Sequence, residues 1–214
     1  MNKLIVLISC IALTTGSFGQ TEEHKFTIYG GGGPQYYKGD VGQGFNKDKN
    51  CSYVQFILGV DYRLNNYLGL KLFATLGDLG YTQSESIRRV NYLEEHGENR
   101  KNDGLNGRMI SGVFALQYNF ANGCILPANC KVAPYLFAGA GINRLADFMK
   151  MGCIVPGIYY TADVGLGAQY RFLPSIFIGY QLVYGIFNSD KLDFIDQNEN
   201  DTHLQNSLVL GFDF

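Results

Sequence analysis

The chain has 214 residues and a formal net charge of -2, which argues against electrostatic binding of nucleic acid. Its 15 Tyr, 15 Phe and 27 Gly favour an all-β membrane or secreted protein over a helical one. No run of the sequence is long enough for a transmembrane helix in the mature chain. A single domain is expected at this length.

The first 19 residues have the pattern of a secretion signal. Lys3 gives a positive start, residues 4–13 are apolar, and residues 17–19 end in the small residue that a signal peptidase accepts. The mature chain is therefore predicted to begin at Gln20. A lipoprotein anchor at Cys10 is the alternative, but the apolar run continues past this cysteine, and cleavage there would leave an unusually short signal.

The mature chain, residues 20–214, is predicted to form one domain of eight β-strands. Successive side chains on a strand point to opposite faces, and eight segments show the matching alternation of apolar with polar or small residues. In chain order these segments cover residues 25–33, 53–64, 67–77, 109–120, 132–143, 158–172, 176–187 and 205–214. The hairpin 158–187 shows the pattern most clearly, and each of its strands is long enough to cross a bilayer when tilted. We therefore predict an all-β fold, an eight-stranded antiparallel up-and-down transmembrane β-barrel.

The charged residues of these segments all fall on the face opposite the apolar one. On the lipid face near mid-membrane, a Lys or Arg would cost about 2 to 4 kcal/mol. An eight-stranded barrel is only wide enough for its own side chains, so we expect a packed lumen in which these charges pair with one another, and no diffusion pore. A proton or ion path along them is the alternative. The predicted lumen charges are Asp61, Arg63, Lys71, Asp163, Arg171 and Asp213.

The lengths of the connections indicate the orientation of the barrel. Those after the second, fourth and sixth strands are short or compact, and the others are generally longer, as in barrels with short periplasmic turns and long outer loops. Both termini are then predicted to be periplasmic. Aromatic residues gather where the even-numbered strands end, at the level of an interfacial girdle. They are Tyr62, Tyr118, Phe120, Tyr170, Phe172, Phe212 and Phe214.

Four cysteines remain after removal of the signal, and disulfides are expected in an oxidising compartment. Cys51 and Cys153 fall on predicted outer loops, whereas Cys124 and Cys130 share one inner turn. Disulfide partners must approach within about 7 Å between α-carbons. We therefore predict the pairs Cys51–Cys153 and Cys124–Cys130.

The last segment, 207–214, ends on alternating apolar residues that include Phe212 and Phe214. With this ending and its eight strands, the chain resembles the small OmpA-like and OmpX-like β-barrels of the Gram-negative outer membrane. The resemblance covers residues 25–214. It implies outer-membrane lipid and the barrel assembly machinery as partners, with Phe212 and Phe214 as part of the assembly signal. Unlike full-length OmpA-like proteins, the chain is expected to carry no peptidoglycan-binding domain after the barrel.

No enzyme, cofactor or metal site is expected from the motifs. The histidines His24, His96 and His203 have no spacing that resembles the enzymes built on similar barrels. In the acidic stretch 188–204, the order of ligands fits an EF-hand at its first positions, but Asp201 stands where a glycine is needed. We expect a solvated loop there.

The sequence thus predicts an integral outer-membrane protein with a structural or adhesive role. Binding residues concentrate on loops held by a rigid scaffold, and the charged stretch 78–108 is the expected site for an extracellular partner. The alternative is a secreted, soluble, lipocalin-like barrel that holds a small apolar ligand. The two differ in polarity, because the lipocalin-like barrel would bury the apolar positions and expose its charges to water.

Overall fold

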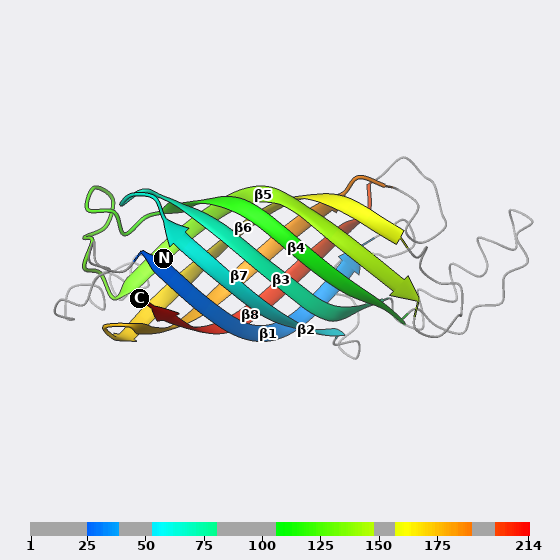
Figure 1. Cartoon of the computed structure of the whole chain (residues 1–214), viewed down its shortest axis with the longest axis horizontal. Coiled ribbons are helices and arrows are strands. Elements are labelled where there is room, and N and C mark those ends of the chain that lie inside the picture. The colour runs from blue at the N-terminus through cyan, green and yellow to red at the C-terminus, as the bar shows by residue number, and fades with distance from the viewer. Residues whose placement is uncertain (1–24, 39–52, 81–105, 148–156, 190–199) are drawn as a thin grey trace, which may run out of the picture.

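The computed structural model describes residues 25–38, 53–80, 106–147, 157–189 and 200–214. Eight antiparallel strands close into one barrel, in which each strand pairs with the next and β1 pairs with β8 (Figure 1). The strands are β1 (Phe26–Lys38), β2 (Tyr53–Arg63), β3 (Leu68–Gly80), β4 (Asn106–Asn119), β5 (Val132–Asp147), β6 (Gly157–Leu173), β7 (Ile176–Phe187) and β8 (Thr202–Asp213). This confirms the predicted up-and-down barrel. Within the described ranges, no helix is long and apolar enough to span a bilayer.

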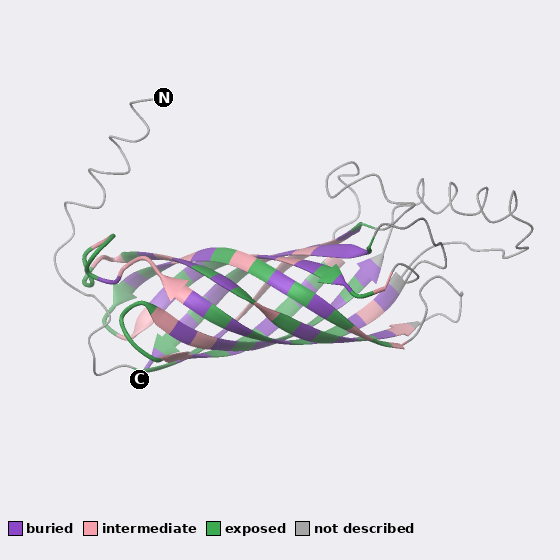
Figure 2. Cartoon of the chain, turned by 90° about the horizontal axis from the view of Figure 1, so that it is seen from above, coloured by how far each residue is buried: buried purple, intermediate pink, exposed green. Residues whose placement is uncertain are grey.

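The two faces of each strand differ as the alternation predicted. Buried and exposed residues follow one another along every strand (Figure 2). The exposed face is apolar and includes Phe56 and Leu166, which are 66% and 48% exposed, whereas Lys71 and Arg171 are 1% exposed in the interior. This polarity contradicts the soluble, lipocalin-like alternative, which requires apolar residues inside and charges outside.

Several strands continue further than predicted, at the end of the barrel away from the termini. The register of β3 with β4 extends through Asp78↔Arg108 to Gly80↔Asn106. Inward apolar side chains, Leu79 and Met109, are fully buried there and keep the strands paired beyond the lipid-length segment. Residues 78–80 and 106–108 of the predicted loop are therefore strand, and residues 81–105 lie outside the described ranges.

These extensions correct the prediction that all strand charges point inward. Asp78 and Arg108 face outward at the distal end, with Arg108 Nε 3.2 Å from Asp78 Oδ1, and both side chains are exposed. Arg144 is exposed on the same face of β5. The energetic argument against outward charge applies only within the hydrocarbon, so it does not constrain strand ends that project beyond it.

The first and last described segments meet at the proximal end of the barrel, defined here by the starts of β1, β3, β5 and β7. Phe26 and Phe214 exchange backbone hydrogen bonds of 3.0 and 2.8 Å, which joins the first described residues to the last (Figure 1). The connections from β2 to β3 and from β6 to β7 at this end are short. Asn65 closes the turn between β2 and β3 by accepting hydrogen bonds from the backbone N–H groups of Tyr67 and Leu68.

Candidate functional site

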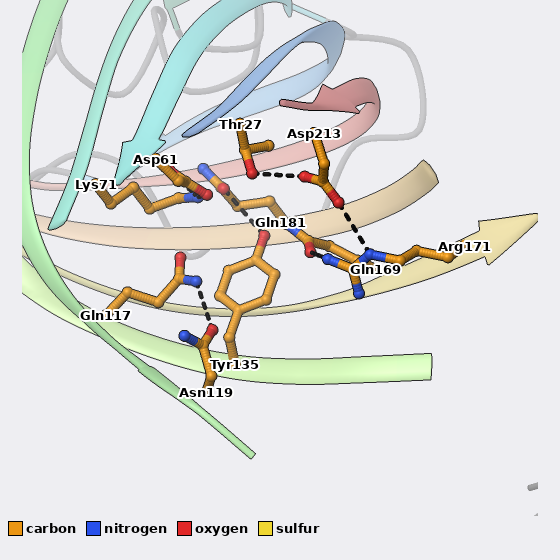
Figure 3. A network of polar contacts seen from close by, with 10 residues as sticks. All are labelled: Thr27, Asp61, Lys71, Gln117, Asn119, Tyr135, Gln169, Arg171, Gln181 and Asp213. Carbon is orange, nitrogen blue, oxygen red and sulfur yellow. Dashed lines mark hydrogen bonds and ion pairs between the residues drawn. The ribbon is translucent and has the colours of Figure 1, made fainter. Parts of the chain in front are cut away.

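The lumen holds a series of buried polar and charged side chains, which begins at the proximal end. Arg171 on β6 reaches across β7 to Asp213 on β8, with Nε 3.0 Å from Oδ2, and both side chains are 1% exposed. Thr27 on β1 donates to the other carboxylate oxygen at 2.6 Å, and Arg171 also donates to Gln169 (Figure 3). Because buried charges need partners, this network ties the terminal strands to β6.

A second buried ion pair lies next to the first. Asp61 and Lys71 are directly opposite each other on β2 and β3, and Lys71 Nζ is 2.9 Å from Asp61 Oδ2. The ammonium group also lies over the rings of Tyr29 and Tyr135, 4.4 and 4.9 Å from their centroids. The Tyr135 hydroxyl in turn donates to Gln181 Oε1 at 3.1 Å (Figure 3). The lysine is therefore held by one carboxylate and by two electron-rich ring faces.

An apolar layer follows the two ion pairs along the barrel axis. Phe73 and Phe137 pack edge to face at 5.9 Å, and the inward residues of the other strands complete the section. The layer comprises Tyr29, Ile57, Phe73, Val113, Ala115, Tyr135, Phe137, Phe177, Val183 and Val209. Inward glycines make room for the larger rings; a Cβ added at Gly165 would lie 2.2 Å from Phe137 Cζ. The side chains themselves fill this part of the lumen.

A polar belt lies distal to the apolar layer. Gln55 Nε2 donates to Ser207 Oγ at 2.9 Å, and Gln205 Nε2 donates to Gln35 Oε1 at 3.1 Å. A second apolar cluster closes the belt at its distal side, formed by Tyr37, Leu79, Met109, Leu145 and Phe187. Several belt atoms have no hydrogen-bond partner among the described residues, including Gln55 Oε1 and Ser111 Oγ. Buried polar atoms of this kind in proteins are generally paired with ordered water.

The belt contains an aspartate and a histidine that sequence reasoning did not bring together. His203 Nε2 lies 3.6 Å from Asp163 Oδ1, which is too long for a hydrogen bond, and both side chains are fully buried. Asp163 accepts a 2.7 Å hydrogen bond from Thr161. The prediction left His203 in a loop because the last strand was expected to start at Gln205. The inward positions of β8 in fact continue to His203, an alternation that was already present in the sequence.

The structure places the six predicted lumen charges in different surroundings. Four form the two ion pairs above, and Asp163 lies in the polar belt. Arg63 is half-buried at the proximal rim, where it lines a cavity of about 20 Å³ with Asp61, Gln117 and Gln169. Of the other histidines, His24 and His96 lie outside the described ranges.

The cysteines of the proximal turn are separate thiols. Cys124 and Cys130 are free, and Cys124 Sγ lies 3.2 Å from the Tyr67 hydroxyl instead of in a disulfide. This hydrogen bond raises the pKa of Tyr67. The structure thus does not show the predicted Cys124–Cys130 bond, and the pair Cys51–Cys153 lies outside the described residues.

Metal ligation finds no support in the described ranges. They contain no group of three His, Cys, Asp or Glu side chains placed to hold a metal ion. Asp201 is buried and accepts a 2.5 Å hydrogen bond from the Tyr37 hydroxyl. Most of the acidic stretch around it, residues 190–199, is not described.

The comparison with protein families decides what kind of barrel this is. Residues 5–214 match the family described as the outer membrane protein beta-barrel domain. The chain belongs to this outer-membrane β-barrel family. The predicted resemblance to small outer-membrane barrels is thereby confirmed, and the protein is an integral protein of the outer membrane.

Solved outer-membrane barrels share the fold at low sequence identity. Neisserial surface protein A has a TM-score of 0.59 and 14% identity, over 88% of this chain and 97% of that chain. Ail, the attachment invasion locus protein of Yersinia pestis, has a TM-score of 0.52 and 19% identity, over 89% of this chain and 99% of that chain. At these identities the likeness is one of fold. No curated protein matches the chain.

In the outer-membrane barrel, the exposed apolar face is the lipid-contacting surface. The predicted assembly residues Phe212 and Phe214 lie on this face, each 47% exposed, with ring centroids 5.5 Å apart. Phe26 of β1 is also exposed and packs on Tyr62 of β2 at 4.8 Å. These rings form part of an aromatic girdle around the proximal end, as expected at a membrane interface.

Proposed function

We propose that this outer-membrane barrel is a closed scaffold with a structural or adhesive role, which binds its partners through the long connections at the distal end. The observation that carries the proposal is the section through the lumen, where two buried ion pairs lie against a continuous apolar layer. Charges that are already paired and packed in this way offer no free path to a solute. Function is then expected at the surface.

The connection between β3 and β4 is the proposed binding region. Its strand ends carry the exposed pair Asp78 and Arg108, and residues 81–105 between the strands carry charges of both signs. A rigid barrel that holds both ends of such a segment is a suitable platform for recognition. Ail, a barrel of the same fold, has also been solved with the heparin analogue sucrose octasulfate, which makes a sulfated glycan a useful probe here.

We propose that residues 1–19 are removed as a signal, that residues 20–214 form the mature barrel domain, and that both termini face the periplasm. The barrel assembly machinery is the proposed partner during insertion, reading Phe212 and Phe214. No catalytic role is proposed, because the His203 and Asp163 side chains are buried away from any substrate.

Adhesion and conductance test the proposed function together. Cells that display the barrel are applied to immobilised heparin, mucin and fibronectin, beside cells that display a variant in which a short Gly-Ser linker replaces residues 82–104. We expect retention on at least one surface, lost in the variant, and no single-channel conductance from the purified barrel in a planar bilayer. Equal retention of both cell types on all three surfaces, or a steady ohmic conductance, would overturn the proposal.

A further inference from the structure

A groove of about 630 Å³ crosses the lipid-contacting surface where β1 and β8 close the barrel. It is lined by Gly32, Gly33, Pro34, Tyr36, Tyr180, Leu204, Asn206, Ser207 and Leu208. At Gly32 and Pro34 the outward positions of β1 carry no large side chain, which leaves space above the strand, and Tyr36 lies at the distal end of the groove. Leu208, which is 59% exposed, forms part of its wall.

The glycines and the proline give this seam an unusual backbone. The register of β1 with β8 runs to Gly32↔Leu208 and resumes at Gln35↔Gln205. Pro34 has no N–H to donate to the ladder, which explains the interruption. The two backbones nevertheless approach closely, since a Cβ added at Gly33 would lie 2.1 Å from the Asn206 carbonyl oxygen. The groove is therefore built into the closure of the barrel.

The amide side chain of Asn206 lies in this largely apolar groove. Asn206 Oδ1 accepts a 2.5 Å hydrogen bond from the Tyr180 hydroxyl. Among the described residues, none accepts a hydrogen bond from its amide N–H₂ group, and a polar group left without a partner against hydrocarbon is unfavourable. Asn206 thus keeps two donors for an acceptor that comes from outside the barrel.

The outward side chains around the distal half of β1 change in chemical character along the membrane normal. Tyr36 and Tyr184 flank Leu204 in register, one row distal to Asn206, as aromatic residues do near an interface. Lys38 lies one row further and is exposed. Successive rows are about 5 Å apart along the normal for a tilted strand. Lys38, the Asn206 amide and the part of the groove lined by Gly32 and Leu208 therefore follow one another from the headgroup level into the hydrocarbon.

We propose that this groove binds one acyl chain of a lipopolysaccharide molecule, with a lipid phosphate at Lys38 and the ester or amide carbonyl of the chain at Asn206. The order of the three contacts matches the order of phosphate, acyl linkage and hydrocarbon in such a lipid. The assignment to lipopolysaccharide rests on the proposed orientation, because the distal half of the barrel then lies in the outer leaflet.

Native mass spectrometry of the full barrel in detergent tests this inference, with diphosphorylated lipid A and dipalmitoyl phosphatidylethanolamine as separate probes. Leu208→Trp fills the groove, and Leu210→Trp is the matched control on the next outward position of β8, outside the groove. Asn206→Leu removes the donors at nearly constant volume. Heat-modifiable migration on a gel verifies that each variant is folded.

We expect one retained lipid A, a loss of at least tenfold in affinity for Leu208→Trp, about fivefold for Asn206→Leu, and no change for Leu210→Trp. Equal retention of lipid A by all variants would overturn the site. Retention of the phosphatidylethanolamine as strong as that of lipid A would overturn the assignment to lipopolysaccharide. A protein dimer that Leu208→Trp abolishes would show that the groove takes a second copy instead. These outcomes leave the adhesion result untouched, so the two proposals fail separately.

Discussion

Lys71 and Asp61 occupy directly opposed positions on β3 and β2, and their side chains meet inside the barrel with Nζ 2.9 Å from Oδ2. Their positions in the ladder place both groups on the inward face, where both side chains are largely buried and each charge is the other's nearest partner. The rings of Tyr29 and Tyr135 occupy the remaining space around the ammonium group. Substitutions of this pair therefore test how strongly the buried charges of the lumen affect the stability of the barrel.

Replacing Lys71 by Met is expected to destabilise the barrel by about 3 to 5 kcal/mol, because Asp61 remains as an unpaired buried charge. The double variant Lys71→Met, Asp61→Leu should recover most of this loss, since both charges are removed. Urea unfolding in lipid vesicles, followed by the heat-modifiable gel band, measures both. As a control, Asp78→Asn breaks the exposed pair with Arg108 and should change stability by less than about 1 kcal/mol. A Lys71→Met variant as stable as the wild type would contradict the packed-lumen interpretation.

Gly139→Ala should impair folding, because the backbone of β4 leaves no room for a methyl group. A Cβ at Gly139 would lie 2.1 Å from the Phe114 carbonyl oxygen and 2.5 Å from Ala115 Cα, and neither atom belongs to a flexible side chain. A cost of about 1 to 3 kcal/mol is expected from overpacking. Gly112→Ala is the matched control, since a Cβ there meets nothing within 4 Å. Urea midpoints that shift equally for the two variants would argue against this register of β4 and β5.

Leu166→Arg should block assembly into the membrane. Leu166 is 48% exposed on the apolar face of β6, and an arginine at mid-membrane depth costs about 2 to 4 kcal/mol. Ala146→Arg is the control, because it lies on the outward face of β5 in register with Arg108, where charges are already present. Western blots of the outer-membrane fraction, with and without boiling, measure the assembled barrel. Normal amounts of folded Leu166→Arg would place this face away from lipid.

Peptide mapping under non-reducing conditions tests the two predicted disulfides. Protein isolated from the outer membrane is expected to show Cys51–Cys153 and Cys124–Cys130, because each pair would share one end of the barrel. The proximal thiols are free in the structure, so the Cys124–Cys130 bond would have to replace the contact between Cys124 and Tyr67. Reduced protein, in which Cys124 is exposed, provides the reference. Detection of Cys51 joined to Cys124 would contradict the proposed topology.

The sequence by itself determined which segments are strands and which face of each strand meets lipid. Period-two alternation is a local property, so Asp163 and Arg171 could be assigned to the interior from their neighbours alone. The pairing of Lys71 with Asp61 could also be predicted from the sequence, because the short turn at Asn65 aligns the two strands. The ends of the strands were harder to predict from the sequence. Asp78, Arg108 and His203 were left in loops because the length needed to cross a bilayer does not limit how far a ladder continues beyond it.

Only the tertiary structure decided which distant residues meet. Arg171 reaches Asp213 across an intervening strand, His203 lies beside Asp163, and the groove at Asn206 exists because β1 returns to β8 at the other end of the chain. These contacts depend on the stagger of the strands around the closed barrel. The stagger is set by all eight strands together, and no local pattern in the sequence records it.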